Sequence, residues 1–177
     1  MKVIDQEIAS LKNSISEMWA LVHQQLYNAG EAMLTGDKEL AYKVISRERR
    51  VNAFELKIDS DCEDIIALYA PVAVDLRFVL AMYKINTNLE RLGDFAESIA
   101  RFAGNLPEGV PVDPQLIKDT RVEEMLQELL SMLTLSQEAF EKESSEIASR
   151  IFLKDNLIDE INHNSTRIIA DYIENHQ

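Results

Sequence analysis

The sequence predicts an all-α protein in which long helices pack side by side as a bundle. Only five Gly and four Pro residues interrupt the 177-residue chain, too few turn signals for a sandwich or barrel of short strands. Apolar residues recur at alternating steps of three and four over five segments, which is the period of amphipathic helices that cross at shallow angles. We therefore expect helices about 40–50 Å long, antiparallel to their neighbours because the connections are short.

Residues 1–104 predict a complete three-helix bundle. Turn signals at Gly36-Asp37 and Ala70-Pro71 separate three helical segments. The second segment has a strict seven-residue apolar repeat, and the third alternates steps of four and three throughout. The expected core positions are Ile8, Leu11, Ile15, Met18, Val22, Val44, Val51, Ile58, Ile65, Phe78, Met82, Ile85, Leu89, Leu92, Ala96, Ile99 and Ala103.

Residues 105–114 predict a linker, and residues 115–177 predict two further helices with a weak break near residues 142–145. Two helices seldom bury both of their apolar stripes. We interpret this part as a second repeat of the bundle that lacks its last helix, which another subunit, the first bundle or sequence beyond Gln177 would supply. We also expect a homodimer or higher oligomer, because an apolar stripe would otherwise stay exposed on Leu126, Leu133, Ile151, Ile158 and Ile168.

Charge and composition exclude several classes of function. The 31 acidic and 18 basic residues give a net charge of −13, which disfavours binding to nucleic acid or anionic lipid. A single cysteine, Cys62, excludes an internal disulfide framework. No signal peptide or spanning segment is visible, so we expect a cytoplasmic protein without membrane insertion. No nucleophile–base arrangement or phosphate-binding glycine loop is present, and we expect no enzyme.

Oxygen-bearing residues follow the core stripes of the second and third segments. Glu48 and Asn52 are one turn apart on the second, and Glu90 and Asp94 are one turn apart on the third. If the two helices fold back about Pro71, Glu48 lies level with Asp94, and Asn52 with Glu90. Carboxylates packed together favour a hard cation, and the absence of nearby His or Cys favours Fe(III), Mn, Mg or Ca over structural Zn. An ordinary solvated helix face remains the alternative.

The last segment repeats the arrangement. Asp155 and Asp159 flank Ile158 as Glu48 and Asn52 flank Val51. They predict one wall of a second carboxylate cluster.

At these residues the sequence resembles the PhoU family of phosphate-uptake regulators. The resemblance covers the whole chain and depends on three motifs at their mutual spacing. These are N-A-F-E at 52–55, P-x-x-x-D-L-R at 71–77 and E-R-L-G-D at 90–94.

The resemblance implies two pseudo-repeated three-helix bundles that carry carboxylate-bridged, multinuclear metal clusters. The matching ligand pairs are Glu90/Asp94 and Asp155/Asp159, with Glu48/Asn52 in the remaining position; Asn52 departs from the carboxylate pattern. We expect iron first, with zinc, manganese, magnesium or calcium as alternatives.

Asp75 and Arg77 of the second motif have a structural interpretation. Asp75 lies where it can complement the positive N-terminal end of the third helix. Arg77 could pair with Asp61, Asp64 or Asp75. A single arginine is a poor oxyanion site, so we favour this role over phosphate binding.

The resemblance implies a cytoplasmic negative regulator of phosphate uptake and phosphate-starvation signalling. Its partners would be the ATPase of a phosphate ABC transporter and a phosphate sensor histidine kinase. One alternative is a PhoU-like accessory domain of a sodium/phosphate cotransporter or another phosphate carrier. A ferritin-like di-iron enzyme is less favoured, because it needs two Glu-x-x-His motifs and only residues 160–163 supply one.

Overall fold

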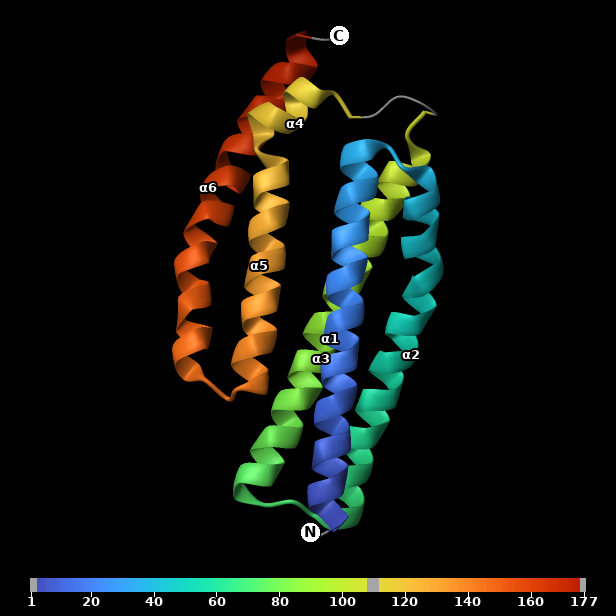
Figure 1. Cartoon of the computed structure of the whole chain (residues 1–177), viewed down its shortest axis with the longest axis vertical. Helices are drawn as coiled ribbons and strands as arrows, with labels where there is room; N and C mark the ends of the chain where they lie inside the picture. Colours follow the sequence, from blue (N-terminus) through green and yellow to red (C-terminus); the bar gives the residue numbers. More distant parts are fainter. Residues whose placement is uncertain (1–2, 108–111, 176–177) are drawn as a thin grey trace.

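The computed structural model describes residues 3–107 and 112–175. Over these residues the chain forms six α-helices and no strand, which confirms the all-α fold class (Figure 1). The helices are α1 (Val3–Thr35), α2 (Lys38–Tyr69), α3 (Ala73–Asn105), α4 (Pro114–Thr120), α5 (Val122–Glu141) and α6 (Ser145–Asn175).

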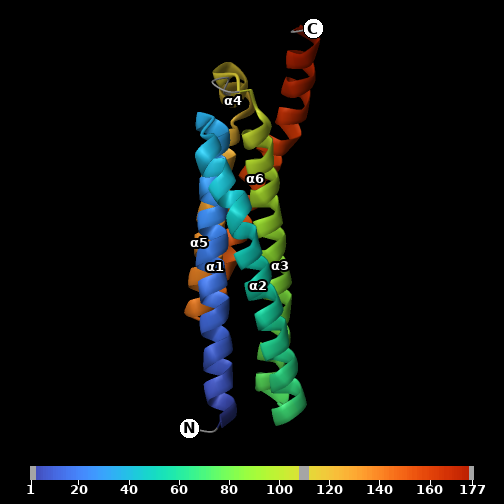
Figure 2. The ribbon, with the colours of Figure 1, turned by 90° about the vertical axis from the view of Figure 1, so that its right-hand side faces the viewer.

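Helices α1, α2 and α3 form an elongated antiparallel bundle, as Figures 1 and 2 show. The predicted heptad residues Val44, Val51, Ile58 and Ile65 of α2 are at most 2% exposed in its core. On α3, Met82, Leu89, Ala96 and Ala103 are buried as predicted. Half of the predicted stripe of α3 is displaced by one residue, because Phe78, Ile85, Leu92 and Ile99 are half-buried whereas Val79, Asn86, Gly93 and Ala100 are buried. Asp37 begins α2 by accepting a hydrogen bond from the backbone N–H of Leu40 at 2.9 Å.

The α2–α3 hairpin turns at Ala70 and Pro71. Ala70 adopts a left-handed conformation (φ 45°) and closes α2 with a hydrogen bond to the carbonyl of Ile66. Pro71 cannot continue the helix, and α3 begins two residues later. The two helices therefore return antiparallel over nearly their full lengths.

Side-chain contacts along this hairpin show its register. A Cβ built on Gly93 would lie 2.9 Å from Cγ1 of Val51, so α3 approaches α2 closely there. Towards the turn, the Cys62 thiol lies 3.9 Å from the carbonyl oxygen of Val79. Both pairs are nearly symmetric about Pro71, which is the register that the turn at this proline predicts.

Residues 114–175 form a second unit beside the first. The expected break between its long helices lies after Glu141, and the Ser144 hydroxyl oxygen accepts the N–H of Ile147 at 3.2 Å at the start of α6. The short helix α4 was not predicted. It ends because Arg121 adopts a left-handed conformation (φ 55°), which separates it from α5.

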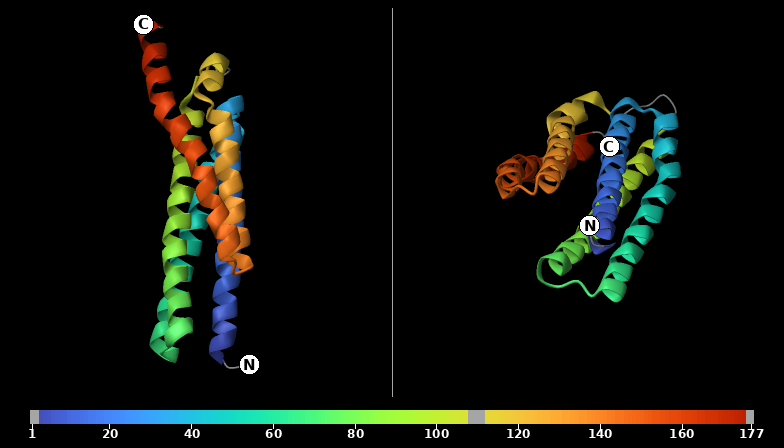
Figure 3. Two further views of the ribbon diagram at one scale, coloured as in Figure 1. Left: turned by 90° about the vertical axis from the view of Figure 1, so that its left-hand side faces the viewer. Right: turned by 60° about the horizontal axis from the view of Figure 1, so that its bottom comes forward.

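Helix α5 docks the second unit onto α1, and α6 lies on the outer side of α5 (Figure 3). The Trp19 indole N–H donates to the carbonyl oxygen of Leu133 at 3.2 Å, and its ring stacks on Phe140 with centroids 5.7 Å apart. Higher up the interface, Leu126 lies directly against Gly30 of α1, where a Cβ would clash with its side chain.

Candidate metal centre on helices α2 and α3

Glu48 is the most unusual carboxylate in the described part of the chain. It belongs to α2, on the side that packs against α3, and is only 6% exposed. Neither of its carboxylate oxygens has a hydrogen-bond partner. A buried, unpaired carboxylate is costly, so its position next to further acidic groups requires an explanation.

The acidic groups around Glu48 come from α3. Burial, followed by the charges of Asp94, Glu97 and Glu90, raises the pKa of Glu48 to about 7. Glu90 has a raised pKa as well, because it is partly buried and lies beside Asp94 and Glu55. The turn at Pro71 thus brings Glu48, Glu90 and Asp94 within electrostatic reach of one another.

Asn52 lies on the exposed edge of this cluster. It lines a surface hollow of about 510 Å³ between α2 and α3. Arg101 in the same hollow forms an ion pair with Glu97, which compensates one of the carboxylates. The remaining lining residues are Ile45, Ser46, Glu48, Arg49 and Asp94.

The polar row continues towards the turn. Asn86 of α3 is fully buried, and its Nδ2 donates to the backbone carbonyl of Glu55 at 2.9 Å and to Oδ1 of Asp59 at 2.7 Å. The pKa of Glu55 is raised by burial and by the charges of Asp59 and Asp94. The α2–α3 seam therefore carries a continuous strip of carboxylate and amide groups.

The donor set of this strip suits a hard cation, since its ligating atoms are carboxylate and amide oxygens. The two unpartnered oxygens of Glu48 have acceptor capacity that a cation would use. Within residues 3–107 and 112–175, no three His, Cys, Asp or Glu side chains yet surround a single point closely enough to hold a metal ion. The carboxylates of the strip lie near one another, but their oxygens do not meet around one point.

Asp155 and Asp159 are not brought to this strip. Both are exposed on α6, which packs chiefly against α4 and α5. Beside them, Lys154 forms an ion pair with Glu128 of α5 at 2.9 Å. The structure thus keeps the two expected ligand sets apart.

Asp75 lies in the first turn of α3, the position at which it complements the helix dipole. Arg77 is exposed. Across the described ranges, the ion pairs do not join Arg77 to Asp61, Asp64 or Asp75; Asp61 pairs instead with Lys57 at 2.6 Å.

Gln25 is a buried polar residue that the sequence patterns did not predict. It is fully buried on α1, and its Nε2 donates to the backbone carbonyl of Val44 at 2.8 Å. It follows Val22 by three residues and precedes the buried Ala29 by four, so it occupies a position of the apolar stripe. Its position on an otherwise apolar stripe is the sequence feature that indicates a buried polar residue.

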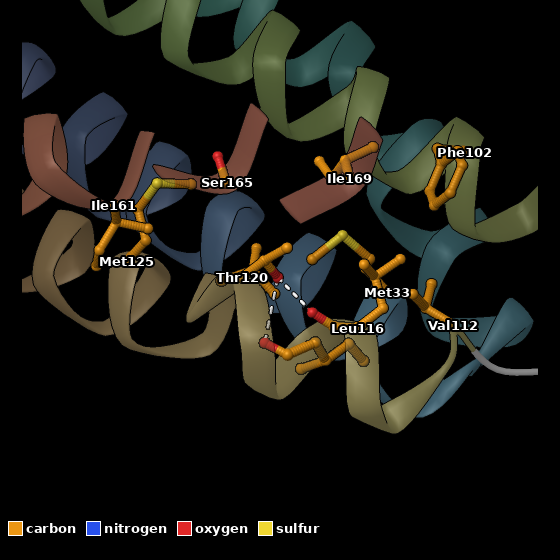
Figure 4. Close-up of a pocket in the computed structure, with 11 residues that line it drawn as sticks. Met33, Phe102, Val112, Leu116, Thr120, Met125, Ile161, Ser165 and Ile169 are labelled. Atoms are coloured by element: carbon orange, nitrogen blue, oxygen red, sulfur yellow. Dashed lines mark hydrogen bonds between the residues drawn. The ribbon is translucent and has the colours of Figure 1, made fainter. Parts of the chain in front are cut away.

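A second concave feature lies between the two units and is apolar. This pocket of about 240 Å³ is enclosed by α1, α3, α4, α5 and α6 (Figure 4). Its Thr120 hydroxyl already donates to the carbonyl of Leu116 at 2.7 Å. No charged side chain contributes to its lining, which consists of Met33, Phe102, Val112, Leu116, Ile117, Thr120, Val122, Met125, Ile161, Ser165 and Ile169. It therefore lacks the charged side chains that a metal or phosphate site requires.

Among the residues that the structure describes, no helix combines the length and the apolar character required to cross a membrane.

Known proteins are similar to this chain in sequence and in architecture. The profile of the PhoU domain matches residues 15–103 and 122–177. The chain is 32% identical to a "Phosphate-specific transport system accessory protein PhoU homolog" of Aquifex aeolicus, covering 95% of this chain and 74% of the relative. It is also 32% identical to "Phosphate-specific transport system accessory protein PhoU" of Escherichia coli, covering 94% of this chain and 68% of that protein.

Two solved structures superpose closely. The phosphate transport system regulatory protein PhoU from Streptococcus pneumoniae has a TM-score of 0.86 and 28% identity, covering 98% of this chain and 80% of that chain. PhoU from Pseudomonas aeruginosa has a TM-score of 0.90 and 27% identity, covering 97% and 80% respectively. Together with the matching domain profile, these similarities show that the chain belongs to the PhoU family.

Proposed function

We propose that this protein is a cytoplasmic accessory regulator of phosphate transport that damps phosphate uptake and phosphate-starvation signalling. The observation that carries the proposal is the alignment over 94–95% of the chain with phosphate-specific transport accessory proteins, through both helical units. The net charge of −13 suits docking onto basic protein surfaces rather than nucleic acid or anionic lipid.

The partners that we propose are the ATPase of a phosphate ABC transporter and a phosphate sensor histidine kinase. Binding of the purified protein to each partner from the same genome, measured by biolayer interferometry, tests this directly. We expect a complex with at least one of them, and constitutive phosphate-starvation expression when the gene is deleted. Absence of both complexes, together with unchanged phosphate-responsive expression, would reject the proposal.

An accessory role for a sodium/phosphate cotransporter or another phosphate carrier is the second candidate. It requires the same fold, so the binding assay separates the two. A complex with the carrier and none with the ATPase or the kinase would favour this candidate.

We further propose that the α2–α3 strip binds metal, with iron as the first candidate and manganese, zinc, magnesium or calcium as alternatives. Glu48, Asn52, Glu90 and Asp94 would hold it, and a bound cation would neutralise the mutual repulsion of the carboxylates. The buried, unpartnered carboxylate of Glu48 supports this assignment. Asp155 and Asp159 would contribute one wall of a separate site.

Elemental analysis of protein purified without chelator tests the metal assignment. We expect bound metal in the wild type and its loss in the double variant Glu90→Ala/Asp94→Ala. The matched control is Glu63→Ala/Asp64→Ala, which removes two exposed carboxylates of α2 outside the strip. Equal metal content in all three proteins would exclude this site, and Asp155→Ala/Asp159→Ala reports separately on α6.

A further inference from the structure

Two buried amide side chains connect α2 to its two neighbours. Gln25 of α1 and Asn86 of α3 are both 0% exposed. Gln25 Nε2 donates to the carbonyl of Val44 at 2.8 Å, and Asn86 Nδ2 donates to the carbonyl of Glu55 at 2.9 Å. Each amide therefore attaches a neighbouring helix to the backbone of α2 at one defined level.

The two attachment points bracket the proposed metal ligands of α2. Val44 precedes Glu48 by one helical turn, and its carbonyl also accepts the N–H of Glu48 within the helix. Glu55 follows Asn52 by three residues. On α3, Asn86 stands one turn before Glu90 and two turns before Asp94, on the same side of the helix.

Burying these two amide side chains costs free energy of folding that apolar side chains would not cost. Oε1 of Gln25 and Oδ1 of Asn86 are buried and have no hydrogen-bond partner. Buried acceptors without partners are unfavourable, so packing alone would favour Leu or Met at both positions. Asn86 also donates to Oδ1 of Asp59 at 2.7 Å, so its hydrogen bonds offset part of this cost. Apolar packing by itself does not explain the two amides in the core.

The apolar seam of α2 does not by itself define how far α2 is displaced along its axis relative to α1 and α3. Val44, Val51, Ile58 and Ile65 repeat every seven residues, and a uniform heptad seam specifies the axial register of a helix only weakly. Buried polar residues in such seams fix the register at the expense of stability. Because carboxylates must meet at one height to share a cation, a small axial displacement of α2 would separate them.

We infer that Gln25 and Asn86 are positioning residues that lock α2 in register with α1 and α3 and so hold Glu48 level with Glu90 and Asp94. This inference rests on the proposed metal site. It concerns Gln25 of α1, which bonds to the backbone of α2, and Asn86 of α3, which bonds to the backbone of α2 and to the Asp59 side chain.

The test uses Mn²⁺ as the probe and measures its affinity by electron paramagnetic resonance of the free ion. We expect Asn86→Leu and Gln25→Met to remain helical with an unchanged or higher urea midpoint, and to bind Mn²⁺ about tenfold or more weakly, as for residues that orient metal ligands. The matched control is Met82→Leu, an apolar exchange one turn before Asn86 at a 2% exposed position. It should leave the affinity within about twofold, because it removes no register contact.

A distance measurement reports on register without metal. Spin labels at the exposed positions Ser60 and Lys84, with Cys62 changed to Ala, should give a narrow distance distribution that broadens or shifts in Asn86→Leu. Unchanged Mn²⁺ affinity in both amide variants would overturn the inference. So would an affinity loss that merely follows a loss of helicity and stability.

The two proposals fail in distinguishable ways. A wild type that binds no Mn²⁺ or iron would reject the metal site, and the spin-label distances would still decide whether the amides set the register. Wild-type binding that is lost in Glu90→Ala/Asp94→Ala but kept in the amide variants would reject only the positioning role.

Discussion

At the scale of the residue, Glu48 places a carboxyl group that is only 6% exposed at the interface of α2 and α3, where neither oxygen has a hydrogen-bond partner. Desolvation and the charges of Asp94, Glu97 and Glu90 raise its pKa to about 7. A carboxyl group whose pKa is raised on folding stabilises the fold fully below its unfolded pKa of 4.5, and this contribution is lost as the pH rises through about 7. The pKa values of Glu55 and Glu90 are also raised.

We therefore expect the metal-free protein to lose stability between about pH 5 and pH 8. Glu48→Gln removes the charge and should stabilise the metal-free protein by about 1–3 kcal/mol at pH 8, with little effect at pH 5. Urea unfolding in the presence of EDTA at both pH values measures this. Glu63→Gln on the exposed side of α2 is the control. A Glu48→Gln variant that is destabilised equally at both pH values would contradict the argument.

At the scale of the element, the α2–α3 hairpin is held by close backbone approach. Gly93 lies in the middle of α3, where glycine costs about 1 kcal/mol relative to alanine in a helix. A Cβ at this position would be 2.9 Å from Cγ1 of Val51, whose β-branched side chain has little freedom to move away. The close approach of the helices thus outweighs helix propensity here.

Gly93→Ala should accordingly destabilise the protein by about 1–2 kcal/mol despite the better helix propensity of alanine. Adding Val51→Ala should make the Gly93 substitution nearly neutral or favourable, because the clash is gone. A double-mutant cycle by thermal or urea unfolding gives the coupling between the two sites. Absence of coupling would show that α3 does not approach α2 as closely as the structure indicates.

At the scale of the whole molecule, the second unit is attached to the first through α1 and α5. Trp19 provides the central contact, since it stacks on Phe140 and donates to the carbonyl of Leu133 while only 6% exposed. Helix α5 packs on the first unit chiefly through α1, whereas α2 and α3 pack extensively on each other and on α1. The two units should therefore respond differently when the contact is weakened.

Trp19→Ala should cost about 3–5 kcal/mol in total stability and release α5 and α6 first. Native-state hydrogen exchange should show faster exchange in α5 and α6, with a smaller change in the centre of α2 and α3. Uniform acceleration across all helices would indicate a single cooperative unit. Lys12→Ala, which removes an ion pair of Lys12 with Glu143 at the same interface, should have a much smaller effect.

The assembly of the protein is also decided at this scale. The apolar stripe that was expected to stay exposed is partly covered by α1, since Leu133 is buried and Leu126 lies against Gly30. Other apolar side chains of the second unit are exposed, among them Leu129 (41%), Phe152 (76%) and Leu153 (75%). Such surfaces mark interfaces, so we expect a homodimer or higher oligomer at micromolar concentration. Light scattering coupled to size-exclusion chromatography measures it, with Phe152→Ser/Leu153→Ser expected to shift the species towards monomer. A wild type that is monomeric throughout would reject this expectation.

Much of the architecture was predictable because the apolar period within each helix and the turns between helices indicate the same bundle. The steps of three and four identify the buried stripe of α2 and most of that of α1, but only half of that of α3. Pro71 sets the approximate level at which α2 and α3 face each other. The helix α4 was missed because seven residues carry too little periodicity to predict a helix. The ion pairs considered for Arg77 also differ from the structure, because exposed pairs contribute little and are not specified by spacing.

The sequence by itself determined the helical class, the core stripes and the two rows of oxygen-bearing residues, since each of these follows from the period of a single helix. Only the tertiary structure decided that Glu48 is buried without a partner, that Gln25 and Asn86 attach their helices to the backbone of α2, and that Asp155 and Asp159 lie apart on α6. The physical reason is that burial and hydrogen bonding between helices depend on axial register, and a repeating apolar seam accepts more than one register.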